Sequence, residues 1–221
     1  MALLDTAAQK TGEAESFKQE ITMDSDLGAE TMKMDGEGVF TADQQSGEMT
    51  ATMEQGGETL EFEAVMVDGV MYLKGDDFGL PEGKEWLKTE QPPTSSMEPA
   101  EFVDFLQQSG DVEEVGTEEI RGEETTHFRG PLDIEKLAAE SGPAIVQQLK
   151  QSPEAKQLNM TIDVWVDGEG MPARLALAIT ADGVEGSMKM SSELLEYDVP
   201  VDVEAPPADE VVDAGDLGAS S

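Results

Sequence analysis

The side chains that could do chemistry are few and unevenly distributed. The sequence has one histidine, His127, no cysteine, and 49 acidic residues against 13 basic ones. A catalytic nucleophile needs a base beside it, and His127 lies in TTHFRG, an apparent strand with no such partner nearby. We therefore interpret His127 as a surface or structural residue and expect no catalytic residues and no enzyme activity.

Glycine and carboxylate motifs do not identify a site either. DGEG and QGG lack the lysine and the spacing of a nucleotide loop. Carboxylates are so abundant that a glycosidase-like pair can always be found, so such pairs carry no information. DVWVDGEG and DAGD depart from the twelve-residue EF-hand pattern. We expect no cofactor and no metal site beyond weak, adventitious cation binding.

The methionines are the distinctive group. The chain has 13, and eight of them occupy the apolar positions of alternating segments: Met23, Met32, Met34, Met49, Met53, Met66, Met188 and Met190. Strands usually place stiff branched side chains there. Methionine is flexible and polarizable, so these residues either fill gaps in a core or line a cavity for an apolar ligand of variable shape. The residues alone leave both interpretations open.

The segments that carry these methionines predict an antiparallel meander. Apolar and polar residues alternate in 16–24, 31–40, 47–55 and 58–67, and the junctions SDLGAE, ADQQSGE and QGGE are typical of hairpin turns. Two strands follow within 67–90, a hairpin within 112–130, and further strands from 160 to 199, with turns at DGEG and ADG. One strand following another through tight turns indicates antiparallel pairing.

Helices are expected in three places. Residues 1–16 suggest a short helix ending near Gly12, PAEFVDFLQQSG has apolar residues at helical spacing, and residues 131–158 read as helical with Asp133 as N-cap. A meander with one apolar face needs a cover. The expected fold is therefore α+β and mostly β, with a single large, strongly curved antiparallel sheet, a short N-terminal helix, and helices packed on the concave face.

The domain division and the charge limit the possible functions. We expect one domain over residues 1–204 and an acidic, Pro/Ala-rich tail over 205–221, extended or disordered. The formal net charge of -36 argues against nucleic-acid binding through a basic patch, and is most simply a solvated surface. The sequence has no apolar run of about 18 residues, the length that would span a membrane. MALLDTAAQK does not read as a signal peptide.

Element order and three loose motifs resemble a known family. VDGVMYLKG and EGKEWLKTE, then VWVDGEGMPARLALAI, then YDVPVDVEAPPADEVVD follow the order of LppX/LprG-type bacterial envelope lipoproteins, which are similar in fold to LolA and LolB. The resemblance covers roughly Leu3 to Val212. The motif residues, taken as fold-defining, are Tyr72, Lys74, Trp86, Trp165, Asp167, Pro172 and Arg174.

The resemblance implies a half-open β-barrel closed by helices around an apolar cavity for acyl chains. It also implies an extracytoplasmic protein of the cell envelope, anchored through a lipidated cysteine of the precursor, although this chain contains no lipobox cysteine. The expected partners are a lipid or acylated ligand and an envelope transporter or acceptor protein.

Given this resemblance to a family of lipid carriers, we favour the interpretation that the methionines line a cavity. The expected lining is Phe17, Ile21, Met23, Met32, Met34, Phe40, Met49, Met53, Leu60, Phe62, Met66, Phe102, Phe105, Leu106, Leu137, Ile145, Leu149, Leu175, Leu177, Met188 and Met190. Two alternatives stay open: a structural or interaction lipoprotein whose filled core leaves only a protein-binding surface, and an extracellular cation-binding sensor domain.

Overall fold

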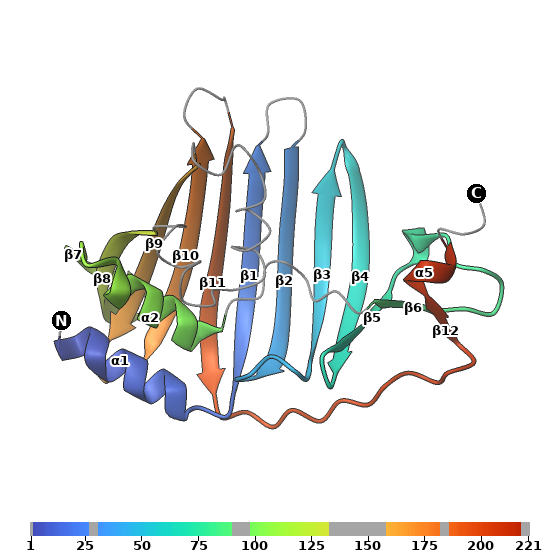
Figure 1. Cartoon of the computed structure of the whole chain (residues 1–221), viewed down its shortest axis with the longest axis horizontal. Coiled ribbons are helices and arrows are strands. Elements are labelled where there is room, and N and C mark those ends of the chain that lie inside the picture. The colour runs from blue at the N-terminus through green and yellow to red at the C-terminus, as the bar shows by residue number, and fades with distance from the viewer. Residues whose placement is uncertain (1, 27–30, 90–97, 133–157, 182–185, 218–221) are drawn as a thin grey trace.

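One twelve-stranded sheet dominates the structure, a computed structural model that describes residues 2–26, 31–89, 98–132, 158–181 and 186–217 (Figure 1). Its strand order is β12-β6-β5-β4-β3-β2-β1-β11-β10-β9-β8-β7, so β12 and β7 are edges and the sheet is not closed into a barrel. Every neighbouring pair is antiparallel except β12 and β6. The mostly β fold and the single large sheet are as expected from the sequence.

The elements follow one another in chain order with these bounds: α1 (Ala2–Glu13), β1 (Ser16–Asp26), β2 (Thr31–Thr41), β3 (Gly47–Gln55), β4 (Glu58–Val67), β5 (Val70–Lys74), η1 (Asp76–Phe78), β6 (Trp86–Thr89), α2 (Pro99–Ser109), β7 (Glu113–Ile120), β8 (Glu123–Leu132), β9 (Leu158–Asp167), β10 (Pro172–Ala181), β11 (Ser187–Tyr197), β12 (Val211–Asp213) and α5 (Ala214–Leu217).

Tight turns fix the register of the first hairpins. Gly56 and Gly57 join β3 to β4 with φ of 62° and 89°, and Asp68 and Gly69 join β4 to β5 with φ of 52° and 77°. Two consecutive positive φ values match the twist of antiparallel strands and favour glycine. Because side chains alternate along each strand, this register decides which residues share a face.

The helices α1 and α2 pack on one face of the sheet, called the inner face below. They lie together over the β8–β11 half, and β6, β12 and α5 form the opposite end (Figure 1). Leu4 of α1 and Phe102, Val103 and Leu106 of α2 are buried in one apolar cluster with inner-face residues such as Val164. The main core is therefore confined to the half of the sheet that these helices cover.

A row of methionines crosses the inner face. Strand pairing places Met190 of β11 opposite Met23 of β1, Met23 opposite Met34 of β2, and Met34 opposite Met53 of β3. Leu177 and Leu60 continue the row on either side. The alternation read from the sequence thus puts these methionines on one face of four adjacent strands.

Two boundaries differ from expectation. The first helix continues one residue past Gly12, to Glu13. Pro131 and Leu132, expected to be helical, end strand β8 and pair with β9, because Leu132 continues the inner-face alternation of Phe128. The rest of that expected helix lies outside the described residues, together with Leu137, Ile145 and Leu149.

The C-terminal segment also differs from a purely extended or disordered tail. It leaves β11 as a chain without regular structure that runs along the lower ends of the strands (Figure 1). It then adds Val211–Asp213 to the sheet as β12, parallel to β6, and ends in the one-turn helix α5.

Candidate functional site

An apolar pocket of about 280 Å³ opens on the inner face of β1–β6, beside the covered core. Its floor comes from these six strands, one wall from β10 and β11, and part of its cover from Phe102 of α2. The lining is Gln19, Ile21, Met34, Phe40, Gln44, Gly47, Met49, Phe62, Ala64, Val65, Met66, Met71, Leu73, Thr89, Phe102, Leu175, Met190 and Ser192.

Small residues of the inner face lie in and beside this pocket. Gly36 and Ala51 are opposite each other on β2 and β3, and Ala64 of β4 lines the pocket. Gly38 lies against the ring of Phe40, and a Cβ there would come 2.8 Å from that ring and 2.7 Å from Cβ of Met49. Because such contacts are too short for carbon atoms, glycine at 38 is required where Phe40 folds over its own strand.

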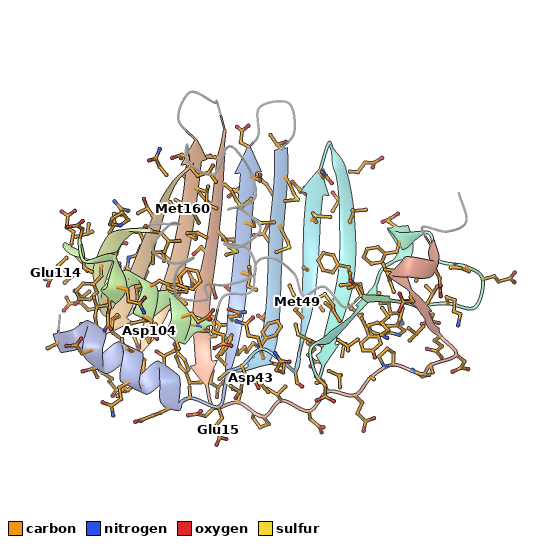
Figure 2. The ribbon with its side chains drawn as sticks, in the orientation of Figure 1. Glu15, Asp43, Met49, Asp104, Glu114 and Met160 are labelled. Atoms are coloured by element: carbon orange, nitrogen blue, oxygen red, sulfur yellow. The ribbon has the colours of Figure 1, made fainter. Side chains whose placement is uncertain are left out.

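Five methionines provide much of the apolar wall: Met34, Met49, Met66, Met71 and Met190. Met49 of β3 is labelled in Figure 2. Met66 and Met71 face each other across β4 and β5 and are only 4% and 5% exposed. Unbranched side chains of this kind change rotamer easily, so the wall can adapt to the shape of its content.

The pocket has one polar corner. Oγ of Ser192 donates a hydrogen bond to Oε1 of Gln19, so these two neighbours on β11 and β1 satisfy each other. Gln44, in the turn after β2, also reaches the lining and is buried. The remaining surface is almost entirely hydrocarbon and thioether, which suits an apolar guest and offers little to orient a polar one.

Acidic side chains of α2 lie next to the pocket residue Phe102. Burial raises the pKa of Glu98, and the charges of Glu101 and Asp43 raise it further. Burial also raises the pKa of Glu101 and of Asp104. The docked helix therefore favours the protonated forms of three of its carboxyl groups.

The residues predicted to line a cavity fall into four groups. Nine border the pocket: Ile21, Met34, Phe40, Met49, Phe62, Met66, Phe102, Leu175 and Met190. Phe17, Leu106 and Leu177 are buried in the core cluster, and Phe105 packs against it. By strand register, Met23, Met32, Met53, Leu60 and Met188 share the inner face beyond the pocket lining. The last three, Leu137, Ile145 and Leu149, are outside the described residues.

Sequence reasoning missed several lining residues. Met71 and Leu73 are the clearest cases, because they lie opposite Met66 and Ala64 across the Asp68–Gly69 turn. Extending the alternation of β4 through that two-residue turn would have found them. Gln19, Ser192 and Thr89 are polar, and composition gave no reason to place them in an apolar pocket.

A second cluster lies on the opposite face, around His127. Its Nδ1 is 3.0 Å from Oε1 of Glu118 and its Nε2 is 2.5 Å from Oδ1 of Asp163, while Nε of Arg129 donates to the same Asp163 oxygen at 2.7 Å. The ring stacks on Trp165 with centroids 4.2 Å apart. His127 is thus buried and hydrogen-bonded, so the expectation of a surface residue without a partner nearby is wrong, and its structural role stays a prediction.

Membrane-spanning helices and metal-binding clusters are absent from the described part of the chain. No helix there is long and apolar enough to cross a membrane. No group of three or more His, Cys, Asp or Glu side chains in that part of the chain is arranged to hold a metal ion.

Comparison with known proteins places the fold. The model of the LppX_LprAFG lipoprotein family matches residues 1–203. The chain belongs to this family. This agrees with the resemblance carried by the YLK, WVDGEGMPAR and YDVP segments.

Two solved structures share the fold of this LppX_LprAFG family member, and one further protein is similar in sequence. LprF from Mycobacterium bovis has a TM-score of 0.54 and 14% identity over 93% of this chain and 95% of its own. LppX from Mycobacterium tuberculosis has a TM-score of 0.53 and 16% identity over 92% of this chain and 98% of its own. An uncharacterized 31.2 kDa protein of Streptomyces griseus is 27% identical, covering 96% of this chain and 78% of that protein.

Proposed function

We propose that this protein is a non-enzymatic lipoprotein of the cell envelope that binds or carries a lipid or an acylated molecule in its inner-face pocket. The observation that carries the proposal is the pocket itself. It is lined by five methionines and several aromatic and aliphatic side chains, in a chain of a lipoprotein family. The carrier domain is residues 1–204, exposed on the extracytoplasmic side, with an envelope transporter or acceptor as its protein partner.

Burial of hydrocarbon supplies the binding energy. Each buried methylene contributes about 0.8 kcal/mol, so a medium-length acyl chain is held without specific polar contacts. The pocket volume of about 280 Å³ is near the lower end of ligand sites, which span roughly 300–1,000 Å³. This size favours one acyl chain, or one segment of it, and the Gln19–Ser192 corner is the natural place for a polar end.

The presence of a pocket favours the carrier over the filled-core alternative. A structural lipoprotein would pack its methionine and phenylalanine side chains at ordinary core density. Here Met34, Met49 and Phe62 border open space instead. The small side chain of Ala64 in the pocket floor points the same way, because a larger residue there would fill the open space.

Lipid uptake by the purified protein tests the proposal. We expect native mass spectrometry to detect a co-purified or added lipid, and a fluorescent fatty acid to titrate to saturation. Ala64→Leu fills the pocket from its floor and should weaken binding at least about tenfold, the equivalent of about 1.4 kcal/mol. Ala178→Leu is the matched control, because it makes the same change on the outer face of β10.

Two results would contradict the proposed lipid pocket. Absence of uptake for every lipid class tried, or equal weakening by Ala64→Leu and Ala178→Leu, would overturn the proposed pocket. Urea unfolding of both variants separates lost binding from lost folding.

A further inference from the structure

The outer edge of β6 holds a peptide segment, residues 209–217, that follows the residues matched by the family model. The family match ends at residue 203, whereas β12 and α5 come from residues 211–217. These residues follow the matched range and complete one edge of the sheet. An added strand on an exposed edge is a general mode of peptide recognition.

The contacts on this edge are specific. The backbone N–H groups of Glu85 and Trp86 both donate to the carbonyl of Glu210, at 2.9 and 3.1 Å. Val211, Val212 and Asp213 then pair with Trp86, Leu87 and Lys88 in parallel register.

Two lysine side chains also contact the segment, one of them through an ion pair. Nζ of Lys84 donates to the carbonyl of Asp209 at 2.8 Å, and Nζ of Lys88 is 3.8 Å from Oδ2 of Asp213. In a chain with only 13 basic residues, two lysines meet an acidic–Val–Val–acidic segment here. The edge thus carries both strand geometry and charge complementarity.

The C-terminal segment, residues 199–217, is held mainly at its two ends. Its start is fixed beside β1, where Oγ of Ser16 donates to the carbonyl of Val199. Residues 200–206 make no hydrogen bond to the rest of the described chain. The docked strand itself has only three residues, and so short a strand adds little stability of its own.

Strand β6 connects the docked segment to the pocket wall, because it pairs with β12 on one side and with β5 on the other. Thr89 of β6 and Met71 and Leu73 of β5 line the pocket, and Met71 and Leu73 pair with Thr89 and Leu87 of β6. A partner strand on the outer side of β6 therefore supports the hairpin that forms this wall. Without it, β6 is an edge strand of four residues.

We propose that the outer edge of β6 is a binding site for an extended acidic–aliphatic peptide, and that this chain fills it reversibly with its own residues 209–213. Filling the site holds the β5–β6 wall of the pocket in place. This assignment concerns the sheet edge and stands whether or not the pocket takes a lipid.

Parallel pairing identifies the amides that report on docking. The N–H of Trp86 donates to the carbonyl of Glu210. In a parallel pair, the carbonyl of Trp86 then accepts from the N–H of Val212, while the N–H of Val211 points away from β6. On β6, the amides of Trp86 and Lys88 face β12 and those of Leu87 and Thr89 face β5. Exchange at Trp86 and Lys88 therefore reports on docking of the segment, and exchange at Leu87 and Thr89 reports on order in the pocket wall.

Full-length variants test the site by residue-resolved hydrogen exchange. Val212→Pro removes the donor, and we expect the amides of Trp86 and Lys88 to exchange about tenfold faster or more, with a smaller increase at Leu87 and Thr89. Val211→Pro, with its N–H already outside the ladder, should leave all four near their original rates. Unchanged exchange at Trp86 and Lys88 in Val212→Pro overturns the proposal.

A synthetic peptide of residues 205–217 then tests whether the edge accepts a strand in trans. Added in excess to the full-length Val212→Pro variant, it should restore protection at Trp86 and Lys88 in a saturable way. The same peptide N-methylated at Val212 should not restore it, and N-methylation at Val211 should have little effect. Failure of the unmodified peptide to protect these amides overturns the binding site.

Discussion

At the scale of single residues, the cluster around His127 shows how a lone ionizable side chain is fixed by structure. Its two ring nitrogens lie 3.0 and 2.5 Å from carboxylate oxygens of Glu118 and Asp163, so both sides of the ring are held by neighbouring strands. Asp163, only 6% exposed, is in turn shared between His127 and Arg129. Trp165 packs against this ring, and Cζ of Arg174 lies 5.4 Å from the Trp165 ring centroid.

Replacing His127 tests this network. His127→Phe keeps the stacking on Trp165 but removes one of the two hydrogen-bond partners of the buried Asp163. We expect a loss of about 2–4 kcal/mol in the free energy of unfolding, measured with urea. The double variant His127→Phe/Asp163→Asn should lose less than the two single losses added together, because the buried charge is gone.

Ligand titration provides the control for this experiment. The cluster is on the face opposite the pocket, so affinity for a fluorescent fatty acid should stay unchanged in His127→Phe. A stability change below about 0.5 kcal/mol, the usual range of surface substitutions, would contradict a structural role.

At the scale of elements, α2 joins the core to the pocket. Its residues Val103 and Leu106 are buried in the core cluster, and Phe102 reaches both that cluster and the pocket lining. The same helix carries Glu98 at its N-cap position, followed by Glu101 and Asp104. Its docking therefore combines apolar burial with carboxyl groups that burial and like charges disfavour in their ionized form.

This arrangement predicts a pH dependence of stability. The raised pKa values mean that the folded chain holds protons which the unfolded chain releases at about pH 4. The contribution of these groups is thus fully present below the unfolded pKa and is lost as pH rises through the higher folded pKa. We expect the urea midpoint to fall over this window, measured at high salt to screen other charges.

A pair of glutamate variants isolates the effect of the helix. Glu101→Gln should make the fall of the urea midpoint with pH less steep, since it removes one of the three carboxyl groups with a raised pKa. Glu113→Gln, on the exposed start of β7, should leave the slope unchanged. Equal slopes for all three proteins would show that α2 is not the source.

At the scale of the whole molecule, the formal charge of -36 governs behaviour in salt. On the outer face, Glu20 and Glu37 are directly opposite each other on β1 and β2. Like charges in such pairs are destabilising, and the summed repulsion opposes the compact state.

Added salt should therefore stabilise the protein. We expect the urea midpoint to rise between about 0.05 M and about 1 M NaCl, as the screening length falls from about 14 Å to about 3 Å. MgCl₂ and CaCl₂ at equal ionic strength should give the same increase. A much larger effect of micromolar calcium would instead favour a cation-binding sensor domain.

Local sequence was sufficient for much of this fold. The meander followed from period-2 alternation and two-residue turns, since both act between near neighbours in the chain. The same alternation put Met23, Met32 and Met34 on one face, and the YLK and WVDGEGMPAR segments indicated the family. The lining role of these methionines stays a prediction, because alternation assigns a face and not a place along it.

Only the tertiary structure decided which part of that face is hollow. Met34 and Met190 border the pocket, whereas Met32 and Met188 are two residues farther along the same strands. That difference depends on where Phe102 of α2 and the β5–β6 hairpin meet the sheet, which are contacts between segments distant in sequence. The parallel pairing of Val211–Asp213 with β6 is non-local in the same way. A three-residue strand carries too little pattern to predict, and its partner is determined by the sheet edge that the rest of the chain leaves open.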